Sequence, residues 1–379
     1  MKKKFSERVY GFLWHLVRKP FEWIFAFQHD SDRENVPTLI ISNHVTNYDP
    51  ILVALSFPGR RIHFVASEHL FRMGLISKVL TYLFEFIPRR KGVSGSDTAM
   101  SVLRQLRDGK SVGLFAEGET TWDGKTASVV SATGRLAQMS KCRLVTYRLE
   151  GGYLTAPRWG KGIRRGKMYG RIVGVYSPEQ LKAMSKEEVQ AAIERDIYED
   201  AHQRQKEAPV AYGKRRLAEG LPTVLFRCPA CEKMGKLSAK GNILRCGCGN
   251  SWEFTPFGNF KTAAPFETVQ QWDRWQRQSL QADAVAQMRD TGATLYILGG
   301  DHRQQKLGKG DLVLKDDVLT CTGQSFALAE ISTMALITTR RMLFTVGNAY
   351  YEVVMDKPCC LRKYLLRWKK ISAVTEPTM

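Results

Sequence analysis

A histidine and an aspartate, His44 and Asp49, follow closely after the apolar run Leu39-Ile40-Ile41. In a continuous helix, residues five apart are separated by about 500° of rotation, so their side chains would not meet. They meet only if the chain turns between them. Asp49-Pro50 is typical of the end of such a turn, because Asp suits a helix N-cap and Pro suits the first helical position. Asp49 would then hold the Nδ1–H of His44 and make the imidazole a general base for a hydroxyl group. Simple helix capping by Asp49 and a purely structural His44 are the alternatives.

Four of the eight cysteines form two close pairs, Cys228 with Cys231 and Cys246 with Cys248. Two such pairs on separate turns present four thiolates tetrahedrally, which is the ligand set that favours Zn²⁺. A site closed by four cysteines is structural, because it leaves no open position for a substrate. The pattern therefore predicts a zinc ribbon. A redox role for the C-x-x-C pair is the alternative, although it leaves the second pair without a purpose.

Three segments, in order along the chain, resemble the motifs of the glycerolipid acyltransferase family, which includes the lysophosphatidic-acid (1-acylglycerol-3-phosphate) acyltransferases. They are Asn43–Pro50 (N-H-V-T-N-Y-D-P), Phe86–Gly92 (F-I-P-R-R-K-G) and Phe115–Gly118 (F-A-E-G), the last followed by Trp122-Asp123-Gly124. The similarity covers roughly residues 30–205. Three ordered motifs are much more specific than the His–Asp pair alone.

The resemblance implies transfer of a fatty acyl group from a thioester, on coenzyme A or acyl carrier protein, to the hydroxyl of a lysophospholipid. The acceptor most directly implied is 1-acyl-sn-glycerol 3-phosphate, which would give phosphatidate; another lysolipid or a glycolipid is the alternative. The family pattern assigns the base to His44 and its orientation to Asp49. Substrate binding is assigned to Asn43, to Arg89 or Arg90 for the acceptor phosphate, and to Glu117 and Gly118 for the shape of the acceptor site. A guanidinium suits a phosphate because it donates two parallel hydrogen bonds. A solvated basic turn is the other interpretation of the two arginines.

The third motif departs from the family pattern F-P-E-G-T-R-S at three positions that matter. Thr120 stands where the family has an Arg, and Glu119 adds an acid; Ala116 replaces the usual Pro. Losing a guanidinium weakens the inference of a bound phosphate. Downstream, residues 157–167 are rich in Arg and Lys, which fits either a loop that contacts phosphates at a membrane surface or a solvated basic loop.

The elements that would position these residues alternate between strand and helix. Short apolar runs at 38–42, 62–66, 111–116 and 143–149 predict largely buried strands, and 97–108 has helical spacing. This alternation predicts an α/β domain with a central sheet flanked by helices. Capping boxes begin at Ser177 and Ser185, and the second predicts a helix over about 185–206.

The charge and the N-terminus indicate a membrane surface. Lys and Arg number 57 against 37 Asp and Glu, a net charge of +20, which predicts a polyanionic partner. Residues 1–29 combine basic residues with Trp and Phe in two short pieces joined at Pro20, typical of helices lying in the bilayer interface; two core helices are the alternative. Polar residues interrupt the apolar run, so neither a signal peptide nor a spanning helix is expected. We expect a peripheral protein at the cytoplasmic face of the membrane.

Nucleic acid is the other polyanion that a zinc ribbon and a basic chain suggest. Residues 232–245, between the cysteine pairs, hold no aromatic residue for base stacking, and the basic residues are spread over the whole chain. Binding of nucleic acid is therefore not expected.

From about residue 293 the sequence predicts short strands with alternating apolar residues, followed by a basic amphipathic helix at 361–371. It resembles a pleckstrin-homology-like or GRAM-type domain, a bent antiparallel barrel plugged by one helix. The basic residues of that helix, among them Arg362, Lys363 and Arg367, fit either a stripe facing lipid or a solvated helix face. The expected organisation is N-terminal helices at 1–29, the acyltransferase domain at 30–206, a linker at 207–223, the zinc ribbon at 224–256, a helical connector at 257–292 and the C-terminal domain at 293–379.

Overall fold

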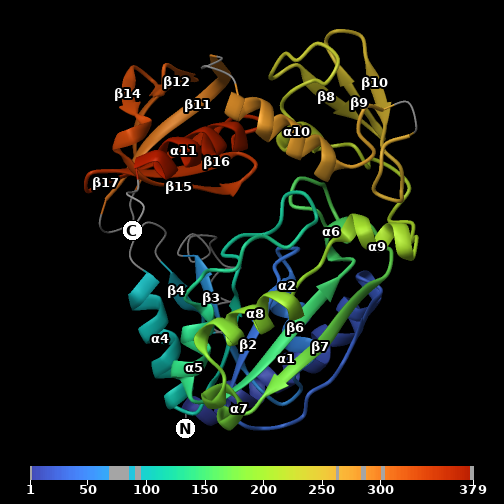
Figure 1. Ribbon diagram of the computed structural model, residues 1–379, viewed down its shortest axis with the longest axis vertical. Coiled ribbons are helices and arrows are strands. Elements are labelled where there is room, and N and C mark those ends of the chain that lie inside the picture. Colours follow the sequence, from blue (N-terminus) through green and yellow to red (C-terminus); the bar gives the residue numbers. More distant parts are fainter. Residues whose placement is uncertain are drawn as a thin grey trace. The chain divides into compact units, whose positions relative to one another are not determined.

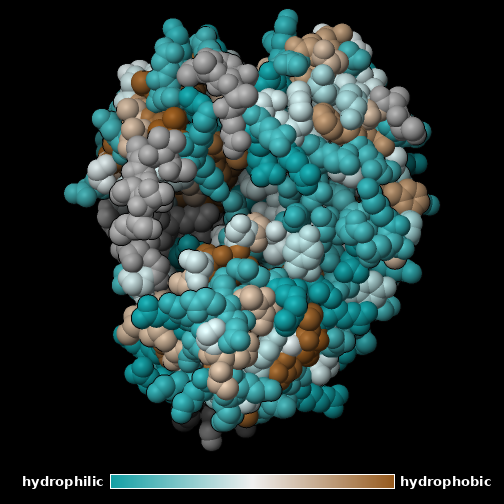
Figure 2. Space-filling model, viewed as in Figure 1, coloured by the Kyte–Doolittle hydropathy of each residue, from teal (hydrophilic) through white to brown (hydrophobic). Residues whose placement is uncertain are grey.

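The computed structural model describes residues 2–67, 85–89, 95–261, 264–282, 287–299 and 304–375 (Figure 1). The chain divides into two compact units, Met1–Lys214 with Pro256–Gly258, and Arg215–Thr255 with Asn259–Met379. The finer domain boundaries expected from the sequence stay predictions. The face of the molecule seen in Figure 2 is mainly hydrophilic, as expected for a chain with a net charge of +20.

The first unit is built on a seven-stranded sheet with the order β1-β7-β6-β2-β5-β3-β4. Its strands are β1 (Phe27–His29), β2 (Thr38–Ser42), β3 (Ile62–Ser67), β4 (Ile87–Arg89), β5 (Ser111–Phe115), β6 (Arg143–Glu150) and β7 (Met168–Tyr176). Strands β2 to β6 are parallel to one another, and β7 is antiparallel to β6. Every residue of β2 is buried, because helices cover both faces of a parallel sheet. The α/β class predicted from the alternation of strands and helices is confirmed.

Helices of the first unit cover both faces of this sheet. They are α1 (Lys2–Ile24), α2 (Asp49–Leu55), α4 (Gly95–Arg107), α5 (Thr133–Ser140), α6 (Gly152–Thr155), α7 (Pro178–Ala183), α8 (Lys186–Asp196) and α9 (Ala201–Glu207). One core cluster contains apolar side chains of α1 and α2, and a second contains those of α4, α5, α7 and α8. Both capping boxes are present, at Ser177 and Ser185.

The helix expected over 185–206 is two helices. Helix α8 ends at Asp196, and Asp200 caps a new helix, α9, by accepting hydrogen bonds from the amides of His202 and Gln203. The sequence prediction missed this cap, because it extended the apolar periodicity of α8 through Asp200.

Helix α1 is a single helix that runs through Pro20, where the sequence suggested two pieces. One face packs on the domain: Trp14 is buried and donates its Nε1–H to the carbonyl of Ala54 at 3.2 Å. A second face holds Phe12, Leu16 and Trp23, which are 69%, 59% and 67% exposed. None of the described helices is long and apolar enough to cross a membrane.

The second unit contains two antiparallel sheets. The smaller has the order β10-β9-β8, from β8 (Leu237–Lys240), β9 (Ile243–Cys246) and β10 (Ser251–Glu253), and follows the short helix η2 (Leu221–Thr223). Helix α10 (Val269–Ala282) comes next. The larger sheet has seven strands in the order β14-β13-β12-β11-β17-β16-β15. They are β11 (Met288–Leu298), β12 (Gln304–Lys315), β13 (Val318–Cys321), β14 (Gln324–Ala327), β15 (Ile331–Thr338), β16 (Arg341–Val346) and β17 (Ala349–Met355), with η3 (Leu328–Glu330) between β14 and β15.

Helix α11 (Arg362–Thr375) closes the chain against this sheet, as Trp368 donates a hydrogen bond to the carbonyl of Ile331 at 2.8 Å. The sequence left two interpretations of its basic residues, a stripe facing lipid or a solvated face, and neither describes Arg362, Lys363 and Arg367. These three are buried in ion pairs: Arg362 with Asp273, Lys363 with Asp290, and Arg367 with Asp317. Helical spacing cannot distinguish a solvated cation from a buried one, because the paired acids come from other elements. The pleckstrin-homology-like identity of this sheet and helix stays a prediction.

Candidate active site

The residues of the three motifs lie at one edge of the sheet of the first unit. Asn43 and His44 follow the last residue of β2, Glu117 and Gly118 follow β5, and Arg89 ends β4. Because these strands are parallel, their carboxyl ends meet at the same edge, which is where open α/β sheets bind their ligands.

His44 and Asp49 are in direct contact. Oδ2 of Asp49 lies 2.8 Å from Nδ1 of His44, and the same oxygen accepts hydrogen bonds from the amides of Val45 at 2.6 Å and Thr46 at 2.9 Å. Asp49 is fully buried, whereas the His44 side chain is 21% exposed. Asp49 is the first residue of α2 and not its N-cap, which is Tyr48. The turn therefore closes on the carboxylate itself, which fixes the aspartate relative to the imidazole.

The imidazole of His44 has a defined orientation. Its ring stacks on Phe115 with centroids 4.4 Å apart and planes 20° from parallel. A carboxylate at Nδ1 accepts a hydrogen bond there, so the proton is assigned to Nδ1 and the lone pair to Nε2. This arrangement can remove a proton from a hydroxyl group placed at Nε2.

Asn43 is fully buried and joins two strands. Its Nδ2 donates to the carbonyl of Leu149 at 2.9 Å, and its Oδ1 accepts from the amide of Leu149 at 2.8 Å. Both polar ends of the side chain are thus used to hold the end of β2 against β6. The motif assigns substrate binding to Asn43. The geometry instead gives more direct support to a role of Asn43 in positioning His44.

Glu117 also acts on the backbone around the base. Its two carboxylate oxygens accept hydrogen bonds from the amides of His44 and Ala127, each at 2.6 Å. Burial raises the pKa of the Glu117 carboxyl to about 8. The two amide hydrogen bonds lower this pKa, and the nearby charges of Asp49 and Glu119 raise it further. Glu117 therefore connects the first and third motifs.

Arg89 and Gly118 lie beside each other. Gly118 has φ +75°, and a Cβ built on it would lie 3.2 Å from Nη1 of Arg89. A larger residue would be strained in that backbone conformation and would crowd the guanidinium. Within the part of the chain that the structure describes, no carboxylate pairs with Arg89. Arg90, the other candidate for the acceptor phosphate, falls outside the described residues.

Arg158 is a residue near the motifs that the sequence interpretation did not single out. Its Nη1 donates to Oε2 of Glu119 at 3.1 Å and to the carbonyl of Thr120 at 3.3 Å. Its guanidinium lies 3.9 Å from the centre of the Trp122 ring. The only sequence signal was its position in the basic loop 157–167, which gave no partner.

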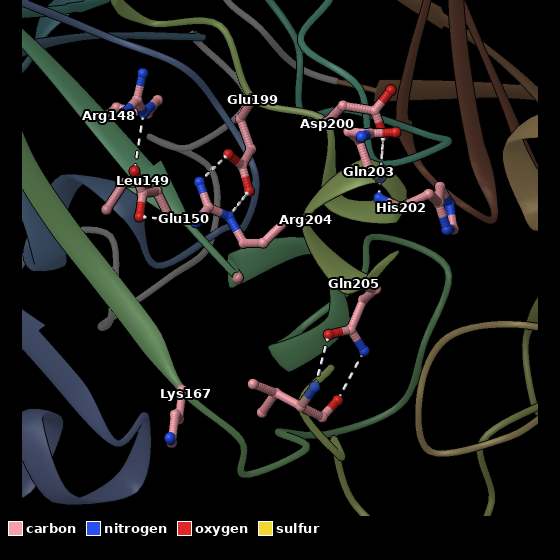
Figure 3. A network of polar contacts seen from close by, with 12 residues as sticks. Arg148, Leu149, Glu150, Lys167, Glu199, Asp200, His202, Gln203, Arg204 and Gln205 are labelled. Atoms are coloured by element: carbon pink, nitrogen blue, oxygen red, sulfur yellow. Dashed lines mark hydrogen bonds and ion pairs between the residues drawn. The ribbon is translucent and has the colours of Figure 1, made fainter. Parts of the chain in front are cut away.

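An ion-pair network connects Arg204 with Glu199 and Glu150 (Figure 3). Arg204 of α9 donates two hydrogen bonds to Glu199, at 2.7 and 2.8 Å, and lies 3.2 Å from Glu150 at the end of β6. The backbone amide and carbonyl of Glu199 bond in turn to Thr126, next to the residue whose amide binds Glu117. Arg148 pairs with Glu150 at 2.9 Å. Helix α9 is thereby tied both to β6 and to the segment that carries Glu117.

The four paired cysteines of the second unit converge on one point. All four Sγ atoms lie within 4.8 Å of one another, with Cys228 and Cys248 at 3.8 Å and Cys231 and Cys246 at 3.7 Å. Four thiolates bound tetrahedrally at about 2.3 Å from a zinc ion would be about 3.8 Å apart. The cluster can therefore hold a metal ion, as the spacing predicted.

Comparison with known proteins finds a family model that matches the motif-bearing part of the chain. Residues 27–150 match the family model described as Acyltransferase. The crystal structure of the 1-acyl-sn-glycerophosphate (LPA) acyltransferase PlsC from Thermotoga maritima is similar, with a TM-score of 0.43 and 17% sequence identity over 52% of this chain and 81% of that one. The matched residues 27–150 include His44, Asp49, Arg89 and Glu117.

Proposed function

We propose that the protein, whose residues 27–150 match the Acyltransferase family model, transfers a fatty acyl group from a thioester to the free hydroxyl of a lysophospholipid. The donor is acyl-CoA or acyl carrier protein, and the first acceptor to test is 1-acyl-sn-glycerol 3-phosphate, which would give phosphatidate. The observation that carries the proposal is the 2.8 Å contact between His44 Nδ1 and Asp49 Oδ2 at the carboxyl edge of a parallel sheet.

In the proposed reaction, Nε2 of His44 takes the proton of the acceptor hydroxyl as its oxygen attacks the thioester carbon. A carbon–oxygen bond forms and the carbon–sulfur bond then breaks. The leaving thiolate receives the proton from the imidazolium, so the base returns to its starting state. The carboxylate of Asp49 stabilises the imidazolium while it exists. The thioester is already activated, which leaves the protein only proton transfer and positioning to supply.

We assign the acceptor phosphate to Arg89. Its guanidinium is next to Gly118, on the same sheet edge as His44, and a guanidinium can donate two hydrogen bonds to one phosphate. Glu117 would act behind the site by holding the backbone amide of His44, and Asn43 by holding the end of β2 against β6.

The test is acyl transfer by the purified protein. His44→Ala should abolish transfer of radiolabelled acyl groups to lysophosphatidate while leaving the unfolding temperature close to that of the wild type. Glu187→Gln, which changes an exposed residue of α8, is the matched control and should keep full turnover. Unchanged turnover by His44→Ala would remove the assigned base.

We also propose that the protein attaches peripherally to the cytoplasmic face of the membrane through α1. Phe12, Leu16 and Trp23 lie within about 40° of one another around the helix axis, on the face that does not pack on the domain. Lys19 lies on the same face, and the guanidinium of Arg165 covers Trp23 at 5.0 Å. Aromatic and basic side chains together are typical of a helix in the bilayer interface.

This attachment can be tested by cosedimentation with vesicles of phosphatidylglycerol and phosphatidylethanolamine. Replacing Phe12, Leu16 and Trp23 by Ser together should release the protein from the vesicles. Met139→Ser, which removes an exposed apolar side chain from α5, should not. Equal sedimentation of the triple variant and the wild type would contradict the assignment.

For the four cysteines we propose a structural Zn²⁺ ion, held by Cys228, Cys231, Cys246 and Cys248. Bound there, the ion would crosslink the two turns that carry the cysteine pairs. It would take no part in acyl transfer, because four thiolates leave no open coordination position.

A further inference from the structure

The third motif lacks the arginine of the family pattern, yet a guanidinium is present at the same stretch of backbone. Thr120 occupies the position of that arginine. Arg158, from the loop that follows α6, donates to the carbonyl of Thr120 at 3.3 Å. A cation thus reaches the third motif from a different part of the chain.

This cation is held by an acid of the motif itself. Oε2 of Glu119 accepts from Nη1 of Arg158 at 3.1 Å and from Nε1 of Trp122 at 3.2 Å. The Arg158 side chain is only 7% exposed, and its guanidinium is stacked on Trp122. Glu119 and Arg158 therefore form an ion pair in which the two charges offset each other, where the family pattern carries one positive charge.

The pair lies close to the groups proposed to act on the acceptor. Thr121, next to Thr120, donates its amide hydrogen to the carbonyl of His44 at 2.9 Å. On its other side Glu119 follows Gly118, which is beside the guanidinium of Arg89. A change in the charge of the pair would therefore act on the same place as the acceptor phosphate.

We propose that Glu119 and Arg158 form a specificity-determining pair, in which Glu119 masks Arg158 and so weakens the preference for a dianionic phosphomonoester acceptor over a monoanionic phosphodiester. The inference rests on the proposed acyl transfer to a lysophospholipid. The third motif then supplies no net positive charge to the headgroup. The enzyme accepts lysolipids of both charge types, with a smaller difference between them than an unmasked arginine would impose.

The experiment compares kcat/KM for lysophosphatidate, a phosphomonoester, with that for lysophosphatidylglycerol, a phosphodiester, using one acyl donor. Glu119→Gln keeps an oxygen for Trp122 and Arg158 but removes the negative charge. It should raise the ratio of kcat/KM for lysophosphatidate to kcat/KM for lysophosphatidylglycerol about five- to tenfold. This is the size expected when one added unit charge acts on one extra phosphate charge near a protein surface. The increase should shrink as the salt concentration rises, which a merely structural effect would not do.

Arg158→Gln is the second variant. It leaves Glu119 without its cation, so the ratio should fall below that of the wild type. Glu187→Gln makes the same charge change on the exposed face of α8 and should leave the ratio unchanged. A ratio that stays within about twofold of the wild type in both Glu119→Gln and Arg158→Gln would overturn the inference.

The proposed function and this inference fail in different ways. If the function is wrong, the wild type transfers no acyl group to either lipid. If only the inference is wrong, the wild type is active, His44→Ala is inactive, and the ratio does not respond to the charge of the pair.

Discussion

Asp49→Asn tests the central electrostatic claim, that a buried carboxylate stabilises the imidazolium of His44. The substitution keeps the shape of the side chain. Its oxygen is expected at the position of Oδ2, facing Nδ1 of His44 and the amide of Val45, because an NH₂ group there would oppose both donors. The new NH₂ group would then face the hydroxyl of Thr46, which can accept a hydrogen bond. The tautomer of His44 is therefore retained, and the negative charge is what is lost.

The magnitude follows from the contact distance. With Nδ1 and Oδ2 2.8 Å apart, the centres of the two charges are about 4 Å apart, and two unit charges at that separation interact by about 4 kcal/mol at an effective dielectric constant near 20. Each 1.36 kcal/mol is a factor of ten in rate, so kcat should fall by about three orders of magnitude. KM for the acceptor should change little, because the carboxylate does not touch the substrate.

The assay measures kcat at saturating donor and acceptor, beside the unfolding temperature of each variant. Thr46→Val is the control, since it removes the 2.6 Å hydrogen bond from the Thr46 hydroxyl to Asp49 and leaves the charge in place. It should cost less than about tenfold in kcat, because the carboxylate loses one hydrogen bond but keeps its charge and its contact with Nδ1 of His44. If Asp49→Asn also stays within tenfold of the wild type, the carboxylate does not act on the base and the reasoning is wrong.

Three further outcomes are expected. The free energy of unfolding of the wild type, relative to that of Glu117→Gln, should fall by about 3–5 kcal/mol in urea unfolding as the pH rises from 4.5 to 8. Burial raises the folded-state pKa of Glu117, so the stability linked to its protonation is lost as the pH rises through that pKa. Cys231→Ser should lower the zinc content, about one ion per chain in the wild type, and the unfolding temperature of the second unit, as measured by elemental analysis and calorimetry. Arg204→Leu should destabilise the first unit by about 2–4 kcal/mol in urea unfolding, because it leaves the buried Glu199 without its cation.

The sequence predicted four of the seven strands in the sheet of the first unit, β2, β3, β5 and β6, for a physical reason. Parallel strands covered on both faces must be almost wholly apolar, and the runs at 38–42, 62–66, 111–116 and 143–149 are all strands of the sheet. The resemblance to acyltransferases is confirmed for residues 27–150. The contact between His44 and Asp49 was also predictable, since only a five-residue turn is needed to form it.

Other features depend on partners that the local pattern cannot reveal. The basic face of α11 pairs with Asp273, Asp290 and Asp317, all from other elements, so its periodicity resembled that of a solvated helix. Helix α1 continues through Pro20 because one of its faces packs on the core, which offsets the hydrogen bond that proline cannot donate. The break at Asp200 was visible as a possible N-cap and was overlooked.

The contacts of the candidate active site therefore join residues that are either close together or far apart in the sequence. This difference affects how acceptor specificity can change. The short-range contact of His44 with Asp49 is set by one turn, so any change there removes the base. The contacts of Glu119 with Arg158 and of His44 with Glu117 join residues 39 and 73 positions apart. Arg158 comes from a surface loop, where substitutions leave the sheet intact. Such a position can alter the charge offered to a headgroup while the proton-transfer pair stays as it is. In the proposed specificity pair, Arg158 brings a positive charge to the backbone of Thr120 and Glu119 offsets that charge, so the motif supplies no net positive charge while the contact of His44 with Asp49 is untouched.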